Sequence, residues 1–174
     1  QLTASRSTPE HFIVGQPFPV IIDLSGQSEK EVAFILKESI PDHAKVVQST
    51  PQHSSKNSET LLLKWITKSK VPASFSYIML IPSAGETTIT FDGSIATSGG
   101  DPLPIGGVTT ISSGNHHWAD SDNDNIISDK EILTVYDKYA ELPGLVDEID
   151  LIEEIWLGEG YTWNAMTLQY DITE

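Results

Sequence analysis

Carboxylate side chains occur at every second position from Asp120 to Asp124, in a polar stretch that ends at Glu131. Carboxylates this close together repel one another unless a cation or a proton neutralises them. A hard cation such as Ca²⁺ takes about six to eight oxygen ligands, and a tightly coiled loop can turn alternate side chains toward one point. The stretch therefore predicts a calcium-binding loop.

The spacing matches the twelve-residue EF-hand loop. The predicted ligands are the side chains of Asp120, Asp122 and Asp124, the carbonyl of Ile126, Ser128 through a water, and two oxygens of Glu131. The sixth position, normally Gly because the turn needs a positive φ, is Asn125, which also tolerates the left-handed region. Two alternatives need no metal: a helix capping box from Ser128 to Glu131, and a solvated Asp/Asn-rich loop.

The net charge of -15 is concentrated at one end of the chain. Residues 115–174 contain 15 acidic and 2 basic side chains, a net charge of -13, which leaves -2 for residues 1–114. Nucleic acids and anionic membrane surfaces select Lys/Arg patches, so this composition argues against both partners and favours a cation. The asymmetry predicts two units, 1–112 and 113–174.

The chain has no cysteine, which excludes disulfides, thiol catalysis and zinc-thiolate sites. It begins at Gln1 without an initiator Met or an apolar signal region, and it has no apolar run of membrane-spanning length. We expect a mature chain from which a signal peptide has been removed. An extracellular or cell-surface location would also supply the calcium.

Residues 1–112 show the alternation of an antiparallel β-sandwich. Phe18, Val20, Ile22 and Leu24 face one way, and the expected strands are Phe18–Leu24, Glu31–Lys37, Ala44–Gln48, Thr60–Ile66, Ser74–Ile81, Thr87–Ala96 and Val108–Ile111. The Gly/Pro-rich residues 98–107 are expected to form a loop, and 112–115 a hinge. No strand–helix alternation, phosphate loop or nucleophile elbow occurs.

Residues 113–174 predict two helices and a strand. The first helix is expected over 128–141 and the second over 147–157, with Ile149, Leu151, Ile152, Ile155 and Trp156 inward and Glu148, Glu153 and Glu154 outward. The second half lacks an acidic loop, so we expect paired hands with one ion, Val146 bridging to Ile127. Residues 166–172 alternate as a strand, which could return to the sandwich or join a neighbouring subunit's sheet.

The last third of the chain resembles dockerin-like EF-hand domains of secreted bacterial and archaeal surface proteins. The matching features are the loop 120–131, the acidic helix 148–156 and the closing Gly160-Tyr161-Thr162-Trp163. The first two thirds resemble immunoglobulin-like or cohesin-like sandwiches, through 14–20, 38–41 and 63–65. A cellulosomal dockerin has two calcium loops and this chain has one, so the resemblance does not imply docking to a cohesin.

Three functions fit these features. The first is a non-enzymatic, secreted calcium-binding structural protein that assembles with copies of itself or other surface proteins through sheet edges, as in a fibre. The second is a cell-surface module that binds glycan or protein. The four tryptophans could form a stacking platform for a ligand, but packing positions are expected for each. Trp65 and Trp156 are expected in the core, and Trp118 and Trp163 between the two units.

The third function is a glycoside-active enzyme that would pair Glu38 with Asp42. No recognised catalytic motif supports it. His116 and His117 are adjacent and are expected to lie in a solvated linker rather than to chelate a transition metal. His11, His43 and His53 are expected at the surface.

Overall fold

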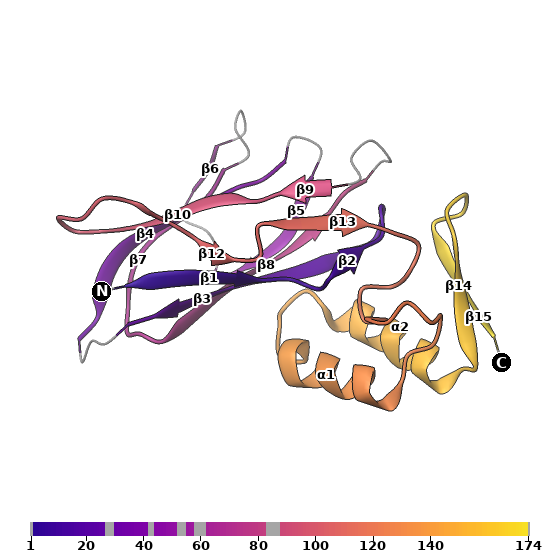
Figure 1. Ribbon diagram of the computed structural model, residues 1–174. Coiled ribbons are helices and arrows are strands. Elements are labelled where there is room, and N and C mark those ends of the chain that lie inside the picture. Colours follow the sequence, from indigo (N-terminus) through magenta and orange to yellow (C-terminus); the bar gives the residue numbers. More distant parts are fainter. Residues whose placement is uncertain are drawn as a thin grey trace.

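The computed structural model describes residues 2–26, 30–41, 44–51, 55–57, 62–82 and 88–173, with the backbone alone for 55–57. The chain is mainly β, with two helices and a hairpin near the C-terminal end, as predicted (Figure 1). Asp42, His43 and His53 lie outside the described residues.

Two five-stranded sheets form the sandwich. The first has the order β12 (Gly106–Gly107), β1 (Thr3–Ser7), β3 (Phe18–Ser25), β8 (Ala73–Leu80), β5 (Lys45–Thr50). The second has the order β11 (Leu103–Pro104), β10 (Asp92–Thr97), β4 (Val32–Ser39), β7 (Leu62–Ser69), β6 (Ser55–Asn57). A smaller sheet joins β2 (His11–Phe12), β13 (Thr110–Ser113) and β9 (Thr88–Thr90).

The alternation in the sequence places most of the predicted strands correctly, with ends that shift by a few residues. The predicted strand at 87–96 is instead two strands, β9 and β10, in different sheets, and Thr60 and Thr87, where two predicted strands begin, lie outside the described residues. Phe18, Val20, Ile22 and Leu24 are all buried, so the predicted inward face of β3 is confirmed. The predicted loop at 98–107 also contains the short strands β11 and β12. The predicted hinge at 112–115 is wrong in part, because Ser112 and Ser113 belong to β13 and pair with β2.

Aromatic side chains fill the space between the two sheets. Phe75 of β8 meets Phe34 of β4 and Trp65 of β7, with ring centroids 5.6 and 5.5 Å apart. Trp65 is buried, as predicted. These edge-to-face contacts join the two sheets through the core.

A buried charge pair also crosses the sandwich. Arg6 of β1 and Glu38 of β4 form a two-point ion pair, with the Arg6 Nε to Glu38 Oε2 distance at 2.8 Å. The Tyr77 hydroxyl donates to Glu38 Oε2 at 2.9 Å, and Arg6 also donates to the Val108 carbonyl. A side chain at Gly93 would collide with Glu38 Oε1. Glu38 is fully buried and its oxygens are engaged, so it does not line a surface cleft as the glycosidase hypothesis requires.

The helices α1 (Asp129–Tyr139) and α2 (Val146–Leu157) pack beside one end of the sandwich, and the hairpin β14 (Gly160–Asn164)–β15 (Gln169–Thr173) follows α2 (Figure 1). We call residues 115–173 the cap. Buried residues of the cap and the sandwich form one hydrophobic cluster. Within the described residues, no helix is long and apolar enough to cross a membrane.

Three predictions about the cap are wrong. Trp156 is 38% exposed, because it lies on the outer side of α2. Glu148 is buried instead of exposed, because it accepts a hydrogen bond from His117. Val146 is exposed and makes no strand pairing with Ile127, because it begins α2.

The C-terminal strand pairs within the chain. β15 is antiparallel to β14, and residues 165–168 form the turn between them, with Leu168 at φ 55° and Met166 almost fully exposed. The predicted strand at 166–172 therefore starts three residues later. It pairs with β14 and not with a strand of the sandwich.

The Arg6–Glu38 pair yields a stability prediction. We expect Arg6→Met to lower the free energy of unfolding by about 3–5 kcal/mol, because it leaves a buried carboxylate without its partner. The double change Arg6→Met/Glu38→Gln should recover part of this loss. Urea unfolding measures both, with the exposed Lys37→Met as control. A cost no larger than that of Lys37→Met would contradict the prediction.

Candidate metal centre

Four carboxylates converge in the loop before α1. Asp120, Asp122, Asp124 and Glu131 each offer an oxygen, and these atoms lie within 4.8 Å of one another. Asp120 and Glu131 are buried, whereas Asp122 and Asp124 are exposed. An all-oxygen donor set suits a hard cation, so the cluster could hold a metal ion.

Backbone N–H groups shape the loop around Asp120. Its Oδ1 accepts from the Asp124 N–H at 3.2 Å, and its Oδ2 accepts from the Asn125 N–H at 3.0 Å. Asn125 has a φ of 65°, which confirms its predicted left-handed conformation, and Asn123 has a φ of 58°. These two turns direct the side chains toward one point.

Glu131 closes the cluster from the first turn of α1. Its Oε1 accepts from the Ser128 N–H at 2.8 Å and its Oε2 from the Ser121 N–H at 2.7 Å. The Ser128 hydroxyl accepts from the Glu131 N–H, so the capping box is present together with the carboxylate cluster. The capping box and the metal loop therefore use the same residues and do not exclude each other.

Four of the six predicted ligands are thus brought together. The Ser128 hydroxyl is used by the helix cap, and the Ile126 N–H donates to Asp124 Oδ1 at 3.0 Å. Coordination by the Ile126 carbonyl and by Ser128 through a water stays a prediction.

The pKa of Asp122, one of the two exposed carboxylates of the cluster, is raised by its surroundings. Desolvation by the surrounding groups, a hydrogen bond with Asp120 and the charge of Glu131 raise the pKa of Asp122 to about 6. The surroundings thus disfavour the charged form of Asp122, whereas a bound cation would favour it. The cluster borders a groove of about 380 Å³, which is also lined by Glu10, Trp118 and Lys130. A cation could reach the carboxylates through this groove.

Tyr161 of β14 connects the hairpin to this loop. Its hydroxyl donates to Asp120 Oδ2 at 2.7 Å and accepts from the His117 N–H at 2.8 Å. Its backbone N–H donates to the Asn125 carbonyl at 3.0 Å, and its carbonyl accepts from the Asn125 side chain. Burial raises the pKa of Tyr161 far above its ordinary value, which keeps the hydroxyl protonated as a donor. The loop thus pairs through Asn125 with the hairpin, whereas we expected it to pair through Ile127 with Val146.

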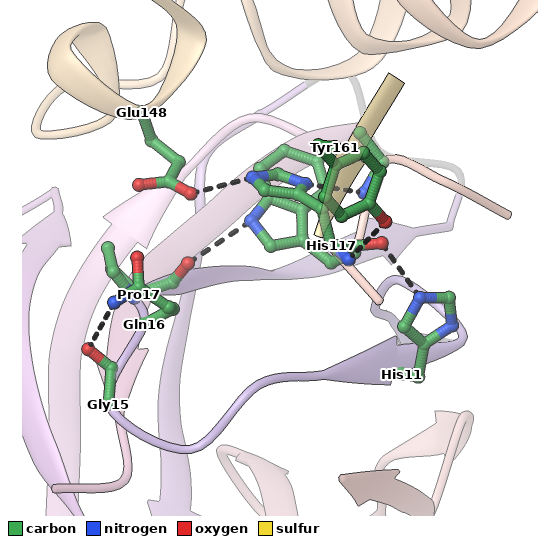
Figure 2. Close-up of polar contacts among 9 residues, drawn as sticks. His11, Gly15, Gln16, Pro17, His117, Glu148 and Tyr161 are labelled. Carbon is green, nitrogen blue, oxygen red and sulfur yellow. Dashed lines mark hydrogen bonds and ion pairs between the residues drawn. The ribbon is translucent and has the colours of Figure 1, made fainter. Parts of the chain in front are cut away.

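His117 connects the loop to α2. It is fully buried, contrary to the predicted solvated linker, and Figure 2 shows it beside Glu148 and Tyr161. Its Nδ1 accepts from the Ala119 N–H at 2.9 Å, which assigns the proton to Nε2, and Nε2 lies 2.7 Å from Glu148 Oε1. A neutral imidazole satisfies both contacts. His116 instead contacts the Asn125 side chain, so the two histidines do not chelate one metal.

Two further contacts attach this segment to the sandwich (Figure 2). His11 of β2 lies 2.8 Å from the His117 carbonyl through its Nε2, and the Trp118 indole donates to the Pro17 carbonyl at 3.1 Å. Trp118 also stacks edge-on against Tyr139 of α1. The prediction that Trp118 packs the cap against the sandwich is confirmed. Trp163 packs on Tyr170 and lines a cavity with Ile13 and Val14 of the sandwich.

Three residues of this centre escaped the sequence analysis: Tyr161, His117 and Glu148. The Gly-Tyr-x-Trp motif at 160–163 marked Tyr161 as notable but did not reveal its partner. Glu148 has the sequence context of an exposed helical residue, and only the position of His117 explains its burial.

Comparisons with known proteins give little functional information. No protein-family model matches the chain. A protein of Archaeoglobus fulgidus described as uncharacterized is 28% identical over 145 residues, which cover 82% of this chain and 71% of that protein. A cohesin module from a Clostridium perfringens family 33 glycoside hydrolase is similar in structure, with a TM-score of 0.47 and 11% identity, over 65% of this chain and 96% of the module.

Asp122 provides a test of the cluster. In chelator, Asp122→Asn should stabilise the fold, because it removes one of four repelling carboxylates, whereas with calcium it should destabilise the fold by removing a ligand. Thermal unfolding in both buffers measures the sign. The exposed Asp137→Asn on α1 is the matched control and should show no reversal. The same sign for Asp122→Asn in both buffers would exclude it as a ligand.

Two tyrosines of the hairpin provide a matched pair. Tyr161→Phe should cost about 1–3 kcal/mol in urea unfolding, because Asp120 and the His117 N–H lose a buried partner. The Tyr170 hydroxyl is buried and has no hydrogen-bond partner among the described residues, so Tyr170→Phe should be neutral or stabilising. Equal costs for the two changes would contradict the proposed role of the Tyr161 hydroxyl.

Proposed function

We propose that the chain is a non-catalytic, calcium-binding structural protein of the cell surface or extracellular space. In this proposal one calcium ion fixes the cap to the sandwich. The rigid unit then assembles with copies of itself or with other surface proteins. The observation that carries the proposal is the convergence of Asp120, Asp122, Asp124 and Glu131 on one point, with Asp120 bonded to the hairpin.

Each residue of the centre has a part in this proposal. A bound calcium would neutralise the four carboxylates and relieve the repulsion among them. Asp120 keeps the loop coiled through its backbone contacts, and Glu131 ties the loop to the start of α1. Tyr161 and His117 transmit this order to the hairpin and to α2.

A stiffening role is favoured over a sensor role. Sensor EF-hands open a helix pair to expose a groove for a target. Here the inner sides of α1 and α2 contribute Ile132, Val135, Ile149 and Ile152 to the same hydrophobic cluster as the sandwich. Opening the helices would expose this cluster to water. The exposure of a few aliphatic side chains costs several kcal/mol, so the closed arrangement is favoured.

Donation of a terminal strand is not part of the proposal. β1 is covered by β3 on one side and β12 on the other, and β15 is paired with β14. Contacts between subunits would therefore use side-chain faces or the remaining edges. The alternative of a module that binds another protein is supported by the exposed Tyr136 and Trp156 on the cap, because aromatic side chains are common anchors in interfaces.

Calcium dependence of stability tests the proposal. Calcium at about 100 times its dissociation constant should add about 2.7 kcal/mol, which corresponds to a rise in melting temperature of roughly 5–11 °C for a chain of this size. Circular dichroism in calcium and in chelator measures the shift. Glu131→Gln should reduce it, whereas the exposed Glu141→Gln should leave it intact. An unchanged melting temperature after chelation of the wild type would contradict the proposal.

A further inference from the structure

The outer face of the second sheet combines lysines with apolar side chains. We define the lysine face as Ile35, Lys37, Lys64, Ile66 and Lys68, which point outward from β4 and β7. Ile35 is the cross-strand partner of Ile66, and Lys37 is the partner of Lys64. The face contains a depression of about 470 Å³ around Ile35 and Ile66.

The charges of the lysine face favour an anionic partner. Like charges directly opposite each other on neighbouring strands are unfavourable. No ion pair to Lys37, Lys64 or Lys68 is found in the part of the chain that the structure describes. Among the outward positions of β4, β7 and β10, Asp92 is the carboxylate, and it lies beside Ser39, beyond the lysine pair.

The outer face of the cap has the opposite character. We define the aromatic face as Asp129, Leu133, Tyr136, Glu153 and Trp156, from the outer sides of α1 and α2. Leu133, Tyr136 and Trp156 are 66%, 43% and 38% exposed. The Trp156 indole donates to Asp129 Oδ1 at 2.9 Å, and the Tyr136 hydroxyl donates to Glu153. Both aromatic side chains are thus held in place before any partner arrives, which lowers the entropy lost on binding.

We propose that the aromatic face of one copy docks on the lysine face of a second copy. This inference rests on the proposed function as an assembling protein, and it names the two surfaces that meet. Apolar side chains occupy the middle of both faces. The carboxylates beside the aromatic side chains would meet Lys37, Lys64 and Lys68 at short range, and this local complementarity has to outweigh the repulsion between two chains that each carry a net charge of -15.

The two faces are different surfaces of the same chain, so the contact is heterologous. The sandwich and the cap lie side by side, and the chain ends lie at opposite ends of the molecule (Figure 1). A heterologous contact leaves one face of each type free at the ends of any open assembly. Successive copies can therefore add head to tail and form a filament.

Complementation between two variants tests the inference. Lys37→Glu/Lys64→Glu disables the lysine face, and Leu133→Lys disables the aromatic face. Each variant alone should be monomeric in light scattering with calcium, over a concentration series in which the wild type associates. An equimolar mixture should form a dimer, because one intact face of each type remains. We expect each change to weaken association on the order of tenfold or more.

Matched controls separate surface position from charge. Lys45→Glu/Lys138→Glu makes the same change in net charge away from both faces, and Met166→Lys adds a lysine to the exposed turn of the hairpin, outside the aromatic face. Both controls should associate like the wild type. If the variants and their controls associate equally, the choice of faces is wrong while self-assembly stands. If the wild type stays monomeric in calcium, both the inference and the self-assembly in the proposed function fail.

Discussion

The hydroxyl of Tyr161 is the contact on which the arrangement of the cap depends. It lies between a carboxylate of the metal cluster, Asp120, and the backbone N–H of His117. His117 continues the connection to Glu148 of α2, and its carbonyl meets His11 of the sandwich. Hairpin, loop, helix and sandwich therefore meet through one short chain of hydrogen bonds, and the low local dielectric strengthens those of Tyr161 and Glu148, which are buried.

In our proposed function, repulsion in the carboxylate cluster makes this chain of contacts depend on a bound cation. Four acidic side chains share a small volume, and Asp122 holds a proton more tightly than an isolated carboxyl does. A cation that removes this repulsion would stabilise Asp120, and through Tyr161 it would stabilise the hairpin. The site thus couples a local charge balance to the position of a whole structural unit, which suits a mechanical role in our proposed function.

Period-2 and period-3.6 patterns were sufficient to predict most of the long strands of the sandwich and both helices, and the spacing of acidic residues predicted the carboxylate cluster, because each depends on residues near in sequence. The inward face of β3 and the left-handed Asn125 are examples. The errors arose where contacts with residues distant in the sequence determine whether a side chain is buried. Glu148 was expected outside because its helix is acidic, yet His117, 31 residues away, keeps it buried. Trp156 was expected inside because it is apolar, yet Asp129 of the other helix holds it on the outer face.

Hydrogen exchange at the Tyr161 and His117 amides, with calcium and in chelator, is the most direct measurement of the central claim. Both amides donate within the chain of contacts, to Asn125 and to the Tyr161 hydroxyl. The account predicts that chelation speeds exchange at both amides and leaves the amide of Val20, in the core of the sandwich, unchanged. Equal exchange at Tyr161 and His117 in the two buffers would contradict it.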